Sequence, residues 1–313
     1  MKVKPTIIVA GDPKSVFFEI FFKSLKKKKN KSPLILIASL KILKSQMKIF
    51  NFKKKIRLLE SNKLKNYKLD NNTINIIDTP LKLGNENTYI KNCFETAFKI
   101  LKARFSNKLI NGPVNKSKFL NKKYLGITEY IAKKFNVKKI AMLIFNPEIS
   151  VCPATTHLPL KLVPGKIDQK LIRDKIQLIN NFFIKDIGFV PRIAVTSVNP
   201  HCESILKSNE DIKILTPAIK SIKKEGYKVH GPLPADTIFL KQNRKEFNVV
   251  LGMYHDQVLS PIKALKEYDA INITSGLPFY RVSPDHGPNE KMINKNLSNP
   301  LSLIKALEFL DQK

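Results

Sequence analysis

The segment FNVVLGMYHDQVLSPIKAL, residues 247–265, predicts a buried strand that ends in a cluster of polar side chains. Residues 247–251 are rich in β-branched side chains and free of charge, which is typical of a strand inside a parallel sheet. Four hydrogen-bonding residues follow almost at once, namely Tyr254, His255, Asp256 and Gln257. Because ligands of open parallel sheets bind beyond the carboxyl ends of the strands, this segment indicates a functional site.

Apolar runs that predict strands alternate along the chain with amphipathic segments of helix length. The predicted strands are residues 5–10, 33–38, 73–77, 108–111, 139–145, 150–155, 192–198, 228–230, 247–252 and 270–274. The predicted helices are residues 14–28, 88–105, 127–136, 168–184, 209–225 and 299–311. This alternation favours βαβ units, and therefore an α/β fold with largely parallel sheets.

The composition is that of a globular protein outside the membrane. The chain of 313 residues is 43% hydrophobic and 26% charged, which is enough to bury a core. Its apolar runs end well before the roughly 18 residues that a membrane span needs. The first strand leads into a Gly-Asp-Pro loop rather than a signal peptide, and the three cysteines form no CxxC pair. We therefore expect a reducing, cytoplasmic location.

The net charge of +31 raises the question of nucleic-acid binding. Most of the 56 basic residues are lysines spread along the chain, whereas arginine dominates specific contacts to bases. Nucleic acid is therefore disfavoured as the main partner, and an acidic or phosphorylated small molecule fits the charge equally well. A lysine-rich protein that binds polyanions stays open as an alternative, which a steep salt dependence of binding would support.

Three of the five histidines follow predicted strands by a few residues: His157, His201 and His255. A single histidine at such a place is usually structural. Three at equivalent positions indicate a shared role, because neutral imidazole is the commonest protein ligand of divalent metals. Three histidines with open coordination positions are typical of a catalytic metal site.

Several motifs occur together in the order of a known family. They are NGPVNK, GITEYIA, TTHLPLKLVP, NPH, GPLPADT, MYHDQVLSPIKAL and INITSGLPFYRVSPDHG. From about residue 7 to its end, the chain thus resembles the 4-hydroxythreonine-4-phosphate dehydrogenases, the PdxA family of pyridoxal phosphate (vitamin B6) biosynthesis.

The resemblance implies an enzyme that uses NAD or NADP to oxidise the 3-hydroxyl of 4-phosphooxy-L-threonine. The resulting keto acid would lose CO₂ and give 3-amino-2-oxopropyl phosphate. It also implies two α/β domains like those of isocitrate and isopropylmalate dehydrogenases, formed by residues 1–122 plus 287–313 and by residues 123–286. The active site would lie in the interdomain cleft at the interface of a homodimer.

The resemblance also implies a metal site shared between the subunits. His157 and His201 of one subunit, with His255 of the other, would bind one divalent ion such as Zn²⁺, Mg²⁺ or Co²⁺. Asp236 and Asp256 would orient a histidine or move a proton, although an ordinary loop cap or turn is an equal alternative for each.

Further positions are implied by the same motifs. Those that contact substrate would be Ile127, Thr128, Lys263, Asn272 and Arg281, of which Lys263 is also a catalytic candidate. Lys263 and Arg281 supply positive charge for a phosphate or carboxylate. The cofactor would bind at Asp285, His286 and Gly287.

The chain departs from the family pattern at four places. The first loop reads GDPKSVFFE (residues 11–19) where the family has a glycine-rich GDPxGIGPE, and Ile127 stands where the family has a histidine. Bulky side chains replace glycines in NPHCESIL (residues 199–206), and PNEKMINKN (residues 288–296) replaces the segment that follows SPDHG. Lys14 is the candidate substitute for the missing donor at residue 127.

These departures leave two interpretations open. One is an active enzyme whose loops around the active site have changed. The other is a protein that has lost or changed its activity and acts, for example, on another phosphorylated 3-hydroxy acid. The retention of the three histidines together with Lys263, Asn272 and Arg281 favours the first.

Overall fold

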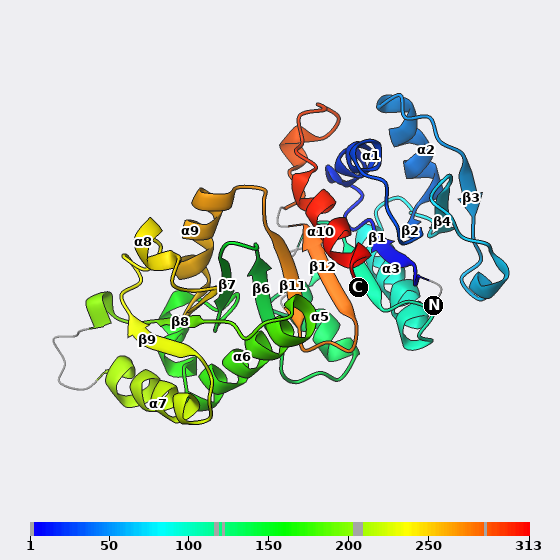
Figure 1. Ribbon diagram of the computed structural model, residues 1–313. Helices are drawn as coiled ribbons and strands as arrows, with labels where there is room; N and C mark the ends of the chain where they lie inside the picture. Colours follow the sequence, from blue (N-terminus) through cyan, green and yellow to red (C-terminus); the bar gives the residue numbers. More distant parts are fainter. Residues whose placement is uncertain (1–2, 116–118, 121–122, 203–208, 285–286) are drawn as a thin grey trace. The chain divides into compact units, whose positions relative to one another are not determined.

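The computed structural model describes residues 3–115, 119–120, 123–202, 209–284 and 287–313 (Figure 1). The chain divides into two compact units. The first unit comprises Met1–Lys123 and Pro278–Lys313, and the second comprises Tyr124–Leu277. The chain therefore passes from the first unit to the second and back again.

The first unit contains a parallel sheet with the strand order β3-β4-β2-β1-β5-β12. Its strands are β1 (Thr6–Val9), β2 (Leu34–Ala38), β3 (Ile56–Leu58), β4 (Ile74–Asp78), β5 (Lys108–Asn111) and β12 (Tyr280–Pro284). The residues of β1 and β2 are buried throughout, as expected for strands covered on both faces.

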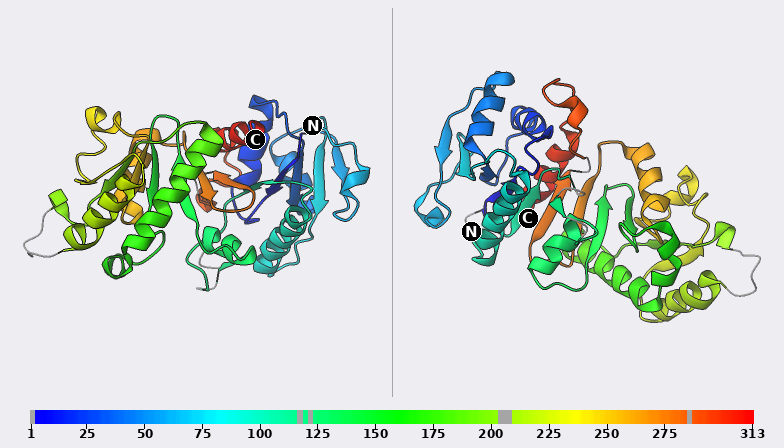
Figure 2. Two further views of the ribbon diagram at one scale, coloured as in Figure 1. Left: turned by 60° about the horizontal axis from the view of Figure 1, so that its bottom comes forward. Right: turned by 180° about the vertical axis from the view of Figure 1, so that it is seen from behind.

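Helices cover both faces of this sheet. They are α1 (Phe17–Lys27), α2 (Leu40–Ile49), α3 (Glu86–Lys102) and α10 (Leu301–Asp311). Helix α1 contacts α10, whereas α3 contacts β1 and β2 from the opposite side (Figures 1 and 2). The altered first loop contributes to this core, because Phe17 and Phe18 are buried at the start of α1.

The second unit contains a mixed sheet with the order β11-β6-β7-β10-β8-β9. Its strands are β6 (Ala141–Phe145), β7 (Ser150–Pro153), β8 (Ile193–Thr196), β9 (Val229–Leu233), β10 (Val249–Gly252) and β11 (Ile271–Ser275). Strand β10 pairs in parallel with β7 and β8, and β8 pairs in parallel with β9. Strand β6 is antiparallel to both β7 and β11.

Helices cover this sheet on both faces as well. Helix α9 (His255–Lys266) contacts β7 and β10, and its residues Val258, Leu259 and Ile262 join a cluster with Val151 and Val250. Helices α6 (Gln169–Phe182) and α7 (Thr216–Lys224) pack together on the other side (Figures 1 and 2). Helices α5 (Ile127–Lys134) and α8 (Lys241–Arg244) complete the α-helices described in this unit.

The predicted α/β fold with largely parallel sheets is confirmed, and each predicted strand and helix matches an element of the structure. Among the α-helices and strands of the described residues, those that were not predicted are β3, β12, α2, α8 and α9. The division of the chain differs from the expected one at residue 123 and at residues 278–286, which were assigned to the second domain. Strand β12 belongs to the first unit because it pairs with β5.

The structure also bears on the absence of membrane spans and on the state of the cysteines. None of the described helices is both long and apolar enough to cross a membrane. Cys93 and Cys152 are free and buried, and burial raises the pKa of the Cys152 thiol to about 11. Cys152 is therefore a neutral, inert thiol at physiological pH.

The last residue of α10 ties this helix to the loop that follows α1. Asp311 is half-buried, pairs with the ammonium of Lys28, and accepts hydrogen bonds from the backbone N–H groups of Lys31 and Ser32. Burial alone would raise the pKa of Asp311, but the hydrogen bonds from Lys28, Ser32 and Lys31 hold it below its ordinary value.

We expect Asp311→Ala to lower the free energy of unfolding by about 2–4 kcal/mol at pH 7, since Lys28 loses its partner. A depressed pKa in the folded state stabilises the protein above the ordinary carboxyl pKa of about 3.9, and this contribution disappears as the pH falls through the folded-state value. Urea unfolding should therefore show a smaller difference between the variant and the parent at pH 3 than at pH 7. An equal difference at both values would contradict this assignment.

Candidate functional site

The three histidines follow three neighbouring parallel strands of the second unit. His157 follows β7, His255 is the first residue of α9 directly after β10, and His201 lies in the short 3₁₀ turn Pro200–Cys202 after β8. Since β10 pairs in parallel with both β7 and β8, the three carboxyl ends meet at one edge of the sheet. The predicted placement of these histidines at strand ends is confirmed.

The rings of His157 and His255 lie together. Their centres are 5.5 Å apart and their planes are inclined by 40°. Two imidazoles bound to one tetrahedral ion through nitrogen at about 2.0–2.1 Å would have ring centres roughly 5 Å apart. The separation of the two ring centres is therefore compatible with a shared divalent ion.

Each of the three histidines has a carboxylate on the side of its Nδ1 atom. Asp256 lies 2.6 Å from Nδ1 of His255, and Asp236 lies 3.8 Å from Nδ1 of His201. Glu129 of α5 lies 3.9 Å from Nδ1 of His157. A carboxylate at Nδ1 favours the tautomer with its proton there, which leaves the lone pair of Nε2 for a metal.

His201 does not join the other two histidines. Its side chain is 70% exposed, and its backbone has a φ of 56°, the left-handed conformation that non-glycine residues adopt uncommonly. Within the described residues of one chain, no group of three histidine, cysteine or acidic residues could hold a metal ion. The altered loop at residues 203–208 lies outside the described residues.

The structure places His157 and His255 of the same chain next to each other, because β7 and β10 are adjacent. The expected grouping pairs His157 with His201 in one subunit and takes His255 from the partner, and it stays a prediction.

Gln257, the last of the four polar residues after β10, has a structural role. Its Oε1 accepts hydrogen bonds from Oγ1 of Thr196 and from the backbone N–H of Met253, and its Nε2 donates to the carbonyl of Ser197. It thereby fastens the turn before His255 to the end of β8. The two titratable residues between Tyr254 and Gln257 are the ones left for chemistry.

The predicted substrate residues of the second unit differ in exposure. Thr128 is buried in the first turn of α5, and Ile127 is the first residue of that helix, so the predicted loop-to-helix transition is confirmed. Oδ1 of Asn272, in β11, is buried and accepts no hydrogen bond from the described residues. Lys263 is half-buried and lies seven residues after Asp256, hence on the same face of α9.

Arg281 lies in the first unit. Its guanidinium is buried in β12 and donates from Nε to Oδ1 of Asn111 at 2.8 Å. Asn111 ends β5, the neighbouring strand, and was not identified as a partner from the sequence. Of the predicted cofactor residues, Gly287 is exposed, whereas Asp285 and His286 lie outside the described residues.

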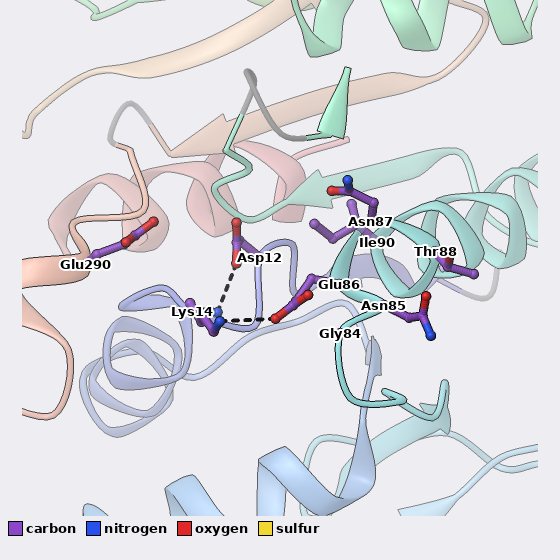
Figure 3. A pocket seen from close by; sticks show the side chains of 9 residues that line it. All are labelled: Asp12, Lys14, Gly84, Asn85, Glu86, Asn87, Thr88, Ile90 and Glu290. Atoms are coloured by element: carbon purple, nitrogen blue, oxygen red, sulfur yellow. Dashed lines mark hydrogen bonds and ion pairs between the residues drawn. The ribbon is translucent and has the colours of Figure 1, made fainter. Parts of the chain in front are cut away.

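A cavity of about 560 Å³ opens in the first unit beside the first loop (Figure 3). It is lined by Asp12, Lys14, Gly84, Asn85, Glu86, Asn87, Thr88, Ile90 and Glu290. The ammonium of Lys14 pairs with Glu86 at 3.1 Å, and this contact raises the pKa of Lys14. Lys14 thus has a carboxylate partner, and this pair would have to open before Lys14 bound a phosphate.

Gly126 allows the close approach of α5 to His157. A methyl group at Gly126 would lie 2.7 Å from Nδ1 and Cε1 of His157 and 2.8 Å from Oε2 of Glu129. The backbone at Gly126 is extended, with a φ of −164°, so alanine would be excluded by the contact and not by the dihedral angle.

We therefore expect Gly126→Ala to weaken the binding of a divalent ion by about 10- to 100-fold, the usual effect of disturbing the surroundings of a ligand. Competition with a chelator, using Zn²⁺ or Co²⁺, measures this affinity. Gly165→Ala is a matched control, because nothing lies within 4 Å of its added methyl group. Equal affinities for the two variants would argue against His157 as a ligand.

The chain matches one protein family over most of its length. Residues 29–310 match the family described as pyridoxal phosphate biosynthetic protein PdxA. A 4-hydroxythreonine-4-phosphate dehydrogenase of Sulfurihydrogenibium sp. (strain YO3AOP1) is 34% identical over 313 residues, or 96% of each chain. A D-threonate 4-phosphate dehydrogenase of Salmonella typhimurium is 32% identical over 303 residues, or 92% of each chain.

Solved structures agree with this match. A 4-hydroxythreonine-4-phosphate dehydrogenase from Klebsiella pneumoniae superposes with a TM-score of 0.81 and 27% identity, covering 99% of this chain and all of the other. Isocitrate dehydrogenase from Methylococcus capsulatus has a TM-score of 0.52 and 10% identity over 97% of this chain and 84% of its own. The second likeness concerns the fold alone, and it agrees with the predicted fold class.

Proposed function

The chain belongs to the PdxA family of dehydrogenases, and we propose that it oxidises the 3-hydroxyl of 4-phosphooxy-L-threonine with NAD or NADP. NAD or NADP, when bound, would supply the hydride acceptor for the hydrogen on C3, and a base of the protein would take the hydroxyl proton. The product would be a 3-keto acid, which loses its carboxylate as CO₂ and takes up a proton at C2 to give 3-amino-2-oxopropyl phosphate.

The observation that carries this proposal is the pair of imidazoles formed by His157 and His255, with ring centres 5.5 Å apart. We propose that both bind one divalent ion through Nε2, with His201 of the partner subunit as the third ligand. Such an ion, when bound, would lower the pKa of a substrate hydroxyl and stabilise negative charge on the product oxygen. Asp256 and Asp236 would orient His255 and His201.

Residues around this pair have separate roles in the proposal. Lys263 and Asp256 share one face of α9, so either can receive the hydroxyl proton. The buried Oδ1 of Asn272 offers an acceptor to a substrate N–H or O–H group. The N-terminal end of α5, at Thr128, suits the phosphate, because the helix dipole favours an anion there. Arg281 remains the proposed contact for a substrate anion.

We propose the cavity of the first unit for the dinucleotide. It borders Glu290, which is three residues after Gly287, one of the predicted cofactor positions. Asp12, Glu86 and Glu290 bring carboxylates that can accept hydrogen bonds from ribose hydroxyls, as acidic residues do in other NAD enzymes. This lining favours NAD over NADP, whose extra phosphate would add negative charge to an acidic cavity.

The test is the formation of NADH or NADPH from 4-phosphooxy-L-threonine by the purified protein. The assay compares NAD with NADP, and protein treated with a chelator with protein supplied with Zn²⁺, Mg²⁺ or Co²⁺. We expect turnover that depends on the metal and is faster with NAD. Absence of turnover by the metal-loaded protein would exclude this function.

D-Threonate 4-phosphate is the second candidate substrate. A relative named for that substrate is nearly as similar to the chain as those named for 4-hydroxythreonine 4-phosphate. The ratio of kcat/KM for the two substrates in one assay decides between them.

A further inference from the structure

Glu129 lies between two segments of the second unit that meet near the imidazole pair. It is in the first turn of α5, and its Oε1 accepts a hydrogen bond from Oγ1 of Thr156 at 2.7 Å. Thr156 directly precedes His157, so this bond ties the helix to the segment that carries the histidine. Glu129 is therefore held in place by a contact that does not involve the imidazole.

The second oxygen of this carboxylate faces the histidine. Oε2 of Glu129 is buried, accepts no hydrogen bond from the described residues, and lies 3.9 Å from Nδ1 of His157. A buried carboxylate oxygen without a donor is costly, and a shift of about 1 Å would bring it within hydrogen-bond distance of the ring. Gly126 leaves the space for this approach, since any larger residue would touch both groups.

We propose that Glu129 positions His157 for metal binding. Its Oε2 accepts a hydrogen bond from Nδ1–H, which fixes the ring orientation and directs the lone pair of Nε2 toward the ion shared with His255. His255 has the equivalent partner in Asp256, at 2.6 Å. The proposal rests on the metal site proposed above, and it adds a residue to that site for which spacing in the sequence carries no signal.

The alternative role of Glu129 is that of a structural brace, which holds α5 to the segment before His157 and has no influence on the metal. The two roles differ in what a substitution changes. A brace alters the stability of the metal-free protein and leaves the affinity for the ion unchanged. A positioning residue alters the affinity, because an imidazole with the wrong tautomer or orientation binds poorly.

The experiment compares Glu129→Ala and Glu129→Gln with the parent protein, without substrate or cofactor. Chelator competition measures the affinity for Zn²⁺, the visible spectrum of bound Co²⁺ reports the ligand geometry, and the melting temperature of the metal-free protein reports the fold. We expect Glu129→Ala to weaken Zn²⁺ binding about 10- to 100-fold and to change the Co²⁺ spectrum. Glu129→Gln keeps an acceptor oxygen without the charge, so its loss should be smaller.

Glu246→Gln serves as the control, because Glu246 is an exposed carboxylate of the same unit. Unchanged affinity and spectrum in Glu129→Ala would overturn the proposal, whatever the melting temperature. If the parent protein itself binds no divalent ion, the metal site and this proposal both fail. The oxidation assay with the phosphorylated substrate tests the reaction separately, so the two failures can be told apart.

Discussion

Replacing His255 by alanine is expected to reduce turnover by about 1000-fold or more while the protein stays folded. Removal of one of three ligands removes most of the polarisation of the substrate hydroxyl, which is worth several kcal/mol. The fold should persist because the ring lies at the helix start, beyond the buried strand β10, and 34% of its side chain is exposed. Steady-state kinetics, metal stoichiometry and thermal unfolding measure the three effects.

Mixed dimers extend this prediction to the grouping of the histidines. If His157 and His255 act from one chain with His201 of the partner subunit, a mixture of His157→Ala and His201→Ala chains contains one intact site in each mixed dimer. A mixture of His157→Ala and His255→Ala chains contains none. We expect activity to return only in the first mixture, to at most about half per mixed dimer.

Recovery in the second mixture would show that His157 shares a site with His201 of its own chain and not with His255 of its own chain. Recovery in neither mixture, with mixed dimers verified, would mean that the site lies within one chain. Retained metal stoichiometry in His255→Ala would remove that residue from the ligand set altogether.

Much of this architecture could be predicted because strand and helix alternate with clear signals. Buried parallel strands such as β1 and β10 are continuous apolar runs, and helices such as α3 are amphipathic over many residues. Strand β12 gave no such signal, since YRVSP carries an arginine and ends in proline. Its pairing with β5 depends on tertiary structure, because β12 returns to the first unit from the second and its local sequence does not indicate which strand it pairs with.

The residues of the candidate site likewise include some that the sequence predicts and some that it does not. His157, His201 and His255 were predicted because each follows a recognisable strand. Glu129 was not, because it precedes His157 by 28 residues and touches it only through the packing of α5. The neighbourhood of His157 and His255 depends on β10 lying between β7 and β8, a strand order that the sequence does not specify.

Ile127 is the departure from the family pattern with the clearest structural setting. It is the first residue of α5, only 7% of its surface is exposed, and the helix begins at Gly126 without a side-chain cap. The helix dipole favours an anion at this helix start. What this helix start lacks, compared with the family pattern, is a side-chain donor.

Ile127→His is expected to lower the KM for the phosphorylated substrate by roughly 10- to 150-fold, the equivalent of one hydrogen bond to a charged group of about 1.5–3 kcal/mol. Ile127→Leu is the matched control, since it keeps an apolar side chain of the same size and should leave KM unchanged. A parallel Lys14→Ala variant tests the substitute donor, and KM should rise only if Lys14 leaves Glu86 to reach the phosphate. If Ile127→His binds metal and cofactor normally but leaves KM unchanged, the phosphate does not bind at the start of α5. The proposed contact with Thr128 would then fail as well, because both residues belong to the same turn.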